Sequence, residues 1–396
     1  MSRGVCCNLM CFSIVDVSEK TRLSEILWLF ERARQMKRMP KIALFGIALL
    51  LLLAAISAAD VRCEIGFPDI LGYKTLKCDL HLHTVFSDAM VWPTVRVDEA
   101  WREGLDVISI TDHIEYQPHK GDIPTNHKRP YEIALPRAKE KNILLIRGAE
   151  ITRDTPPGHF NAIFLTDISP LDTNDFNDVV GTANAQSGFV FWNHPGWKPE
   201  AKGWLDIHTK LYENNWLHGI EVANGDTYYP EAHQWCLEKN LTMIGSSDMH
   251  DPSLVLKSSP ENHRTMTLVF AKDKSIEGLR EALAEGRTTV WCNNRLIGKR
   301  EYLEEIFKAS VEVAEPHNSR KDETWLEIRN RSDIDIEMER IGTLGPRELT
   351  LPANSTTILK TKVNHEAKQV KLLYLVKNFL TAPEKGLSVN LIIPIQ

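Results

Sequence analysis

Histidine and carboxylate side chains lie at the end of an apolar run, residues 76–82. His81 lies within this run, His83 follows it directly, and Asp88 comes shortly afterwards. Side chains two residues apart on a strand point to the same side, so His81 and His83 can both reach one cation. Mixed imidazole and carboxylate ligands suit zinc, manganese or iron. The spacing therefore predicts a metal site at the end of this run.

The same residue types end other apolar runs. They are Asp112 and His113 after residues 107–110, Glu150 within 143–151, His159 at the start of 159–165, His194 after 189–192, and Asp248 and His250 after 241–245. Residues 153–158 are too short for a helix and predict a hairpin, which returns His159 to the side of Glu150. The carboxyl ends of parallel strands form one ligand face. We therefore expect these side chains to meet in one site.

Apolar runs and helical stretches alternate between residues 76 and 290, which predicts an α/β fold. The seven expected strands are residues 76–82, 107–110, 143–151, 159–165, 189–192, 219–223 and 241–245. A further strand is expected at residues 263–270. Ser275 is expected to cap a helix that ends at Gly286.

The pattern changes after residue 310. Short alternating runs at residues 325–329, 334–338, 356–363, 370–376 and 387–393 are separated by turn-forming residues. Such spacing is typical of a small all-β sandwich. We therefore expect two domains after the leader, residues 60–310 and residues 311–396.

Residues 1–59 are expected to be a leader. A basic segment precedes the apolar stretch 42–59, which ends in small residues, as in a secretory signal peptide. Translation is expected to start at Met36 or Met39. We expect the protein to be exported, either to the periplasm or out of the cell, and to have no membrane span once the signal peptide is cleaved. The alternative is an N-terminal membrane anchor, because 18 apolar residues are near the minimum for a span.

The overall composition argues against some classes of protein. Lys and Arg total 47 and Asp and Glu total 53, a net charge of −6, and no sustained basic run occurs outside the N-terminus. A nucleic-acid scaffold role is therefore not expected. Outside the leader, the cysteines are Cys63, Cys78, Cys236 and Cys292, and none forms a CxxC pair. Zinc binding by cysteine is not expected either.

The ordered motifs DLHLHT..SD, TDH, GAE, an isolated His, NHP and SDMH resemble the PHP (polymerase and histidinol phosphatase) superfamily over roughly residues 77–250. The resemblance implies a distorted (β/α)7 barrel with two to three divalent ions, Mn, Zn or Fe. It assigns His81, His83, Glu150 and Asp248 to the first ion. By the same resemblance, Glu150 would bridge to a second ion held with His159 and His194, and Asp88, His113 and His250 would hold a third. Residues 263–288 and the export signal resemble the exported PHP phosphodiesterases.

The expected activity is hydrolysis of a small phosphodiester by a hydroxide that adjacent metal ions generate. A phosphomonoesterase is the alternative, and a non-catalytic surface-binding module is a third reading. Arg264 is the candidate phosphate contact, Asp112 is expected to orient a ligand histidine, and His263 is a weaker candidate proton donor. Trp192, Trp197 and Trp204 either line a pocket for the ester's organic group or pack in the core. The oligomeric state is left open.

Overall fold

The computed structural model describes residues 61–198, 203–255, 262–314, 318–320, 323–362 and 369–394. The expected leader, with Met36 and Met39, lies outside the described residues. All elements below belong to one compact unit, Arg62–Gln396. Among the described helices, none combines the length and the apolar character needed to cross a bilayer.

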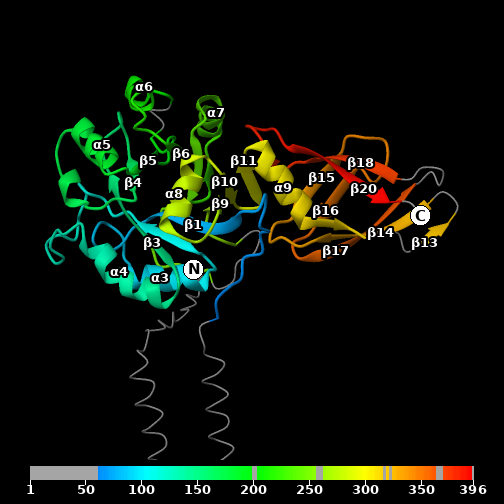
Figure 1. Ribbon diagram of the computed structural model, residues 1–396, viewed down its shortest axis with the longest axis horizontal. Helices are drawn as coiled ribbons and strands as arrows, with labels where there is room; N and C mark the ends of the chain where they lie inside the picture. Colours follow the sequence, from blue (N-terminus) through cyan, green and yellow to red (C-terminus); the bar gives the residue numbers. More distant parts are fainter. Residues whose placement is uncertain are drawn as a thin grey trace, which may run out of the picture. The chain divides into compact units, whose positions relative to one another are not determined.

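Seven strands form a curled sheet that corresponds to the expected barrel (Figure 1). They are β1 (Lys74–Leu82), β2 (Val107–Ile110), β3 (Leu144–Ile151), β4 (Phe160–Ile163), β5 (Phe189–Trp192), β6 (Gly219–Asn224) and β8 (Thr242–Ser246). The pairs β1–β2, β2–β3, β5–β6 and β6–β8 are parallel. A short strand, β7 (Thr227–Tyr228), extends β6 as a hairpin.

Strand β4 runs antiparallel to both of its neighbours, β3 and β5. This is the hairpin that residues 153–158 predicted, because no helix fits in so short a connection. Glu150 pairs with Asn161 across the hairpin, which brings His159 to the end of the sheet where Glu150 lies. The barrel therefore departs here from a regular alternation of parallel strands and helices.

Helices connect the other strands. They are α3 (Pro93–Arg102), α4 (Arg129–Glu140), the 3-10 turn η1 (Ser169–Leu171), α5 (Phe176–Ala185), α6 (Asp206–Glu213), α7 (Pro230–Lys239), α8 (Ile276–Ala284) and α9 (Arg300–Ser310). The predicted cap of α8 is confirmed, since the Ser275 hydroxyl accepts a hydrogen bond from the Gly278 N–H. Gly286 adopts the left-handed conformation, with φ of 63°, just after this helix.

Backbone hydrogen bonds join the end of β8 to the end of β1. The Asp248 N–H donates to the His81 carbonyl (3.0 Å), and the His83 N–H donates to the Met249 carbonyl (3.3 Å). These bonds place two motifs that are far apart in the sequence side by side. The metal motif around Asp248 is thereby held against the motif around His81.

The sheet continues beyond β1 through strands that pair antiparallel, β9 (Met266–Ala271), β10 (Thr288–Cys292) and β11 (Arg295–Gly298). Strand β9 begins later than expected, so His263 and Arg264 precede it. A two-residue strand, β19 (Phe379–Leu380), pairs parallel with β11 and comes from the C-terminal region.

The C-terminal region forms the expected all-β sandwich from two sheets. One sheet contains β12 (Val311–Val313), β13 (Asn318–Arg320), β14 (Glu323–Asn330) and β17 (Ser355–Lys362). The other contains β15 (Ile336–Arg340), β16 (Glu348–Leu351), β18 (Gln369–Val376) and β20 (Leu387–Pro394). The sequence patterns did not single out β16. Alternate residues of β18 are buried, as expected for a sheet with one covered face.

Barrel and sandwich share a hydrophobic core. One cluster of buried side chains includes Leu82 and Ile108 of the barrel together with Leu326 and Tyr374 of the sandwich. The buried Asn378 side chain donates hydrogen bonds to the Asn294 and Asp335 carbonyls, which ties the same two regions through their backbones.

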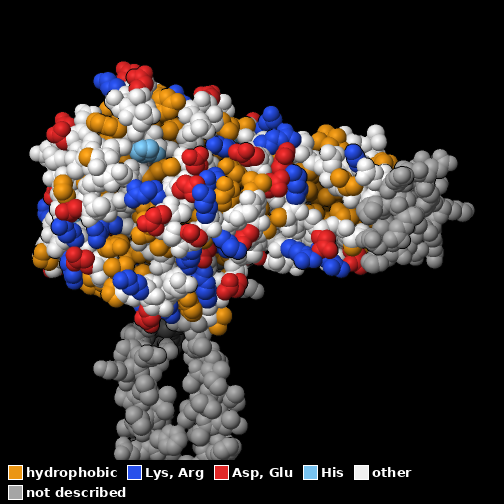
Figure 2. Space-filling view, viewed as in Figure 1, with side chains coloured by type: hydrophobic (Ala, Val, Ile, Leu, Met, Phe, Trp, Pro, Cys, Tyr) orange, Lys and Arg blue, Asp and Glu red, His pale blue; other side chains and the backbone are white. Residues whose placement is uncertain are grey.

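Charged side chains of both signs are interspersed on the visible face of the described residues (Figure 2). Interspersed charges of this kind form no continuous basic surface on that face. The absence of a nucleic-acid scaffold role stays a prediction.

We predict that Phe379→Ala destabilises the whole unit by about 3–5 kcal/mol, because Phe379 is fully buried in the junction between barrel and sandwich. Urea unfolding followed by tryptophan fluorescence measures the change. Ile358→Ala on β17 is the control, since Ile358 is 71% exposed and its loss should cost within about 0.5 kcal/mol. Equal effects of the two substitutions would contradict a structural role for Phe379.

Candidate metal centre

The structure brings all nine expected metal ligands together. Within each of four overlapping groups, the candidate ligand atoms lie within 4.8 Å of one another. The groups are His83–Asp88–His113–His250, His81–His83–Asp248, His81–Glu150–His194 and His113–Glu150–His159. Because the groups share members, they form one continuous cluster. Their division among two or three ions stays a prediction, since His83 and His113 each join two groups.

The cluster lies where the parallel strands end. His81 lies in β1 and His83 directly follows that strand, Glu150 lies in β3, and Asp248 comes just after β8. The Nε2 atoms of His81 and His83 are 3.0 Å apart, so the two imidazoles do point to the same side. His194 follows β5 with φ of 30°, a left-handed backbone conformation that turns the chain there.

The carboxylate of Glu150 lies at the centre of the cluster. Its Oε2 atom is 2.7 Å from His113 Nδ1, 3.4 Å from His83 Nε2 and 3.6 Å from His81 Nε2. Oε2 is buried, yet it has no hydrogen-bond partner among the described residues, and Asp88 Oδ1 is in the same situation. A buried carboxylate oxygen without a partner is costly. Both atoms therefore fit the role of metal ligands.

The electrostatics of the cluster favour bound cations. Burial by itself lowers the pKa of His113, but the carboxylates of Glu150 and Asp88 outweigh burial and raise this pKa to about 10. Burial opposes a raised pKa at His81 too, yet Asp248, Glu221 and Glu150 hold that pKa well above its usual value. The carboxylates thus attract positive charge to the site, which protons or divalent cations can supply.

His83 behaves differently. Its burial lowers the pKa to about 4, and the hydrogen bond to Asp248 only partly opposes this. The ring is therefore neutral at neutral pH, which is the form that binds a metal ion.

Asp112 contacts the cluster through other side chains. Its carboxylate accepts hydrogen bonds from the Thr84 backbone N–H (2.6 Å), the Thr84 hydroxyl (2.7 Å) and the Ser87 hydroxyl (2.7 Å). The Ser87 hydroxyl also lies 3.3 Å from His83 Nδ1. Asp112 can therefore orient His83 through Ser87, and its contribution to metal binding stays a prediction.

The structure corrects the expectation that Arg264 contacts phosphate. Its side chain is fully buried, with a bidentate pair to Glu103 (2.7 and 2.9 Å) and a contact to Asp79 (3.1 Å). A substrate has no access to a guanidinium that is closed off in this way. Asp79 in turn accepts hydrogen bonds from the backbone and side chain of Ser247. Arg264 thus supports the segment that carries Asp248.

His263 is not placed as a proton donor. Its two ring nitrogens lie 2.8 Å from the Arg264 carbonyl and 2.9 Å from the Asn293 carbonyl, and the ring stacks on Trp291 at 3.5 Å. Burial lowers the pKa of His263. Both nitrogens face the protein backbone, so the ring has a structural role.

Sequence reasoning missed Glu221, a fully buried residue of β6. Its Oε1 lies 2.9 Å from His81 Nδ1, and its Oε2 accepts hydrogen bonds from the His194 N–H and the Asn224 side chain, both at 2.8 Å. One carboxylate therefore orients two of the expected ligands. A single Glu inside an otherwise apolar strand is the signal that could have identified it.

Arg96 of α3 was also missed. Its Nε donates to the His83 carbonyl, Nη1 to Glu99 and the Asp251 carbonyl, and Nη2 to the Met249 and His250 carbonyls, all at 2.8–2.9 Å. All five guanidinium N–H groups are thus used. Arg96 joins the backbones of the two segments that carry His83 and His250. No short motif marks this residue.

Comparison with solved structures gives an extensive match. A solved two-domain protein from Bacteroides vulgatus, described as containing a predicted PHP-like metal-dependent phosphoesterase, is 44% identical, with a TM-score of 0.80. The match covers 85% of this chain and 100% of that one. A family model described as an Ig-like domain matches residues 310–392. A search of the curated proteins gives no match.

Two more distant structures have a 16% identity each. A protein from Bifidobacterium adolescentis, described as a metal-dependent phosphoesterase, has a TM-score of 0.36, with 53% of this chain and 96% of that one covered. An amidohydrolase from Chromobacterium violaceum has a TM-score of 0.34, with 44% and 88% covered.

The extensive match identifies the class of protein. The chain belongs to the PHP-like metal-dependent phosphoesterases and carries a C-terminal Ig-like domain. The resemblance that the motifs indicated is therefore confirmed, as is the barrel-plus-sandwich architecture. At the level of its family the protein is a hydrolase of phosphoric esters.

We predict that Glu221→Gln weakens Mn²⁺ binding by about 10- to 100-fold. The amide keeps the size of the side chain, but its NH2 group faces either His81 Nδ1 or the His194 N–H, and the negative charge is lost. Calorimetric titration of the metal-free protein measures the affinity. Glu238→Gln, an exposed change on α7, is the control. Unchanged binding in Glu221→Gln would show that Glu221 does not orient the ligands.

Proposed function

We propose that this protein is an exported metal-dependent phosphodiesterase that hydrolyses a small phosphodiester. The observation that carries the proposal is the buried Glu150 carboxylate, whose Oε2 accepts no hydrogen bond from the described residues and lies among three imidazoles at the carboxyl ends of the strands. Two to three divalent ions, Mn, Zn or Fe, bound by the nine residues would supply an acidified water and offset charge on the phosphoryl group.

The protein's own residues would prepare this site before a substrate binds. Asn193 donates a hydrogen bond to Glu150 Oε1 (2.9 Å), and Asn224 donates to Asp248 Oδ2 (3.2 Å). With Glu221 behind His81, these contacts hold carboxylates and imidazoles in place. A site that is already ordered requires no reorganisation during the reaction, which supports hydrolysis rather than simple ligand storage.

The positive charge near the cluster supports a diester rather than a monoester. Arg264 is buried in its ion pairs, and Lys198 is the one lysine or arginine among the described residues that line the pocket beside His159 and His194. A monoester carries up to two negative charges at neutral pH, whereas a diester carries one. A single cationic side chain suits the lower charge.

Export is the part of this proposal that rests on the sequence. The apolar stretch 42–59, with its basic flank, is the proposed signal peptide, and it lies outside the described residues. The proposed partner is a small-molecule phosphoester, and no nucleic-acid scaffold role is proposed.

We predict that the Mn²⁺-loaded full chain binds two to three ions and hydrolyses bis(4-nitrophenyl) phosphate faster than 4-nitrophenyl phosphate. His83→Ala and Glu150→Ala should each lower kcat by about 10³-fold, because each removes a metal ligand. Nitrophenolate release and metal analysis are the measurements. His119→Ala, a change of an exposed histidine outside the cluster, should leave the rate unchanged.

The results of these assays distinguish the phosphodiesterase from the phosphomonoesterase and from a binding protein without catalytic activity. If the protein hydrolyses only the monoester, the phosphodiesterase proposal is wrong and the phosphomonoesterase is the better reading. Activity that persists after chelation, or a protein without bound metal, would contradict the proposed mechanism. A protein that binds metal but hydrolyses neither ester would favour a binding role.

A further inference from the structure

We propose that Trp197 and Lys198 form a substrate subsite for phosphate esters with a planar aromatic group. Trp197 would stack on the ring, and Lys198 would bind the phosphoryl oxygens. This inference rests on the proposed phosphoesterase function and specifies its substrate class.

A tight turn holds the two residues beside the metal cluster. The Trp197 N–H donates to the carbonyl of His194 (3.0 Å), which closes the turn His194-Pro195-Gly196-Trp197. A Cβ atom on Gly196 would lie 3.0 Å from the ring of Tyr229, so the turn packs closely on its neighbour. Pro195 further restricts the backbone. The subsite residues therefore have a defined position relative to His194.

The Trp197 side chain is available to a ligand. It is 60% exposed, although its ring centroid lies 5.5 Å from that of His159 and 5.7 Å from that of His194. The ring planes are inclined by 51° and 68°, so neither histidine covers the indole face in a parallel stack. This exposed aromatic surface lies next to the metal-ligand cluster, so it is available to a ligand that reaches the cluster.

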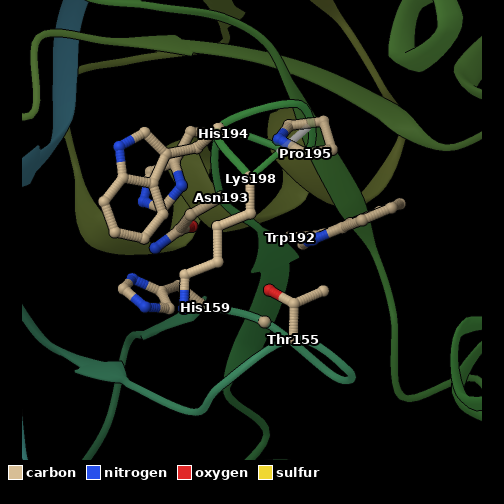
Figure 3. Close-up of a pocket in the computed structure, with 9 residues that line it drawn as sticks. Thr155, His159, Trp192, Asn193, His194, Pro195 and Lys198 are labelled. Atoms are coloured by element: carbon tan, nitrogen blue, oxygen red, sulfur yellow. The ribbon is translucent and has the colours of Figure 1, made fainter. Parts of the chain in front are cut away.

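The Lys198 ammonium is held only weakly by the protein. Its Nζ lies 3.1 Å from Asp154 Oδ1, but the Asp154 side chain is fully exposed, and such surface pairs contribute little. The side chain extends toward His159, and both residues line the same pocket (Figure 3). A phosphoryl oxygen bound near His159 and His194 could therefore replace Asp154 as the partner of the Lys198 ammonium.

The spacing of the two side chains fits an aryl ester. Lys198 Nζ lies 5.4 Å from the centroid of the Trp197 ring. In an aryl phosphate, one ester oxygen separates the aromatic ring from phosphorus, so the apolar and anionic parts of the ligand are also close together. A substrate with a small alkyl group could use Lys198 but would leave Trp197 without a contact.

Binding of two monoanionic diester analogues tests this subsite. The probes are monomethyl phenylphosphonate and monomethyl methylphosphonate, titrated calorimetrically into the Mn²⁺-loaded full chain. Trp197→Ala should raise the Kd of the phenyl probe about tenfold and leave that of the methyl probe unchanged. Lys198→Met should raise both Kd values about tenfold, because both probes carry the anionic group.

Two control variants match the tested residues. Tyr116→Ala removes another exposed aromatic side chain, whose ring lies 5.9 Å from that of His113. Lys128→Met removes a lysine whose Nζ lies 3.2 Å from Asp167 Oδ2. Lys128 is not among the residues that line this pocket. Both controls should leave the two Kd values within about twofold of the wild type.

The proposal is overturned if Trp197→Ala raises the Kd of both probes equally or changes neither Kd. It is also overturned if Lys198→Met changes neither Kd, or if the wild-type protein binds neither probe. A wild-type protein that binds the phenyl probe as expected but hydrolyses no phosphodiester would retain the subsite and refute the proposed function. The two proposals can therefore fail separately.

Discussion

The burial of negative charge at the carboxyl ends of the strands is the constraint on which the site depends. Glu150 is fully buried, and Asp88 and Asp248 lie close to it among six histidines. Removing a carboxylate from water costs several kcal/mol unless positive charge compensates it. The pKa of each of these three carboxyls lies below its usual value, because the nearby imidazoles outweigh the effect of burial. The arrangement is thus suited to divalent cations.

Buried polar residues behind the cluster keep these ligands in position. Glu221 connects His81 with the backbone of His194, and Arg96 connects the backbones at His83 and His250. Arg264, once expected at the substrate, has a similar supporting position through Asp79. Each of these side chains joins segments that come from different strands or helices. Orientation of the ligands is therefore a property of the assembled barrel.

The Ig-like domain contributes to the same assembly. Its strand β19 extends the barrel sheet, and its core side chains belong to the cluster that contains Leu82, the residue between His81 and His83. Packing of the sandwich thereby supports the end of β1, where His81 and the following His83 lie. The domain is therefore part of the structural unit that holds the site.

The sequence by itself determined the strands of the barrel, the hairpin at residues 153–158 and a set of candidate ligands at the strand ends, from which the resemblance to the PHP superfamily selected nine. These features follow from local rules: two-residue periodicity, turn composition, and the meeting of parallel strands at their carboxyl ends. Only the tertiary structure decided the partners of Arg264, His263 and Glu221. Glu221 and His81 are 140 residues apart in the chain, and Arg264 and Asp79 are 185 apart. Pairing of buried charges depends on distances between such remote segments, and no local pattern encodes those distances.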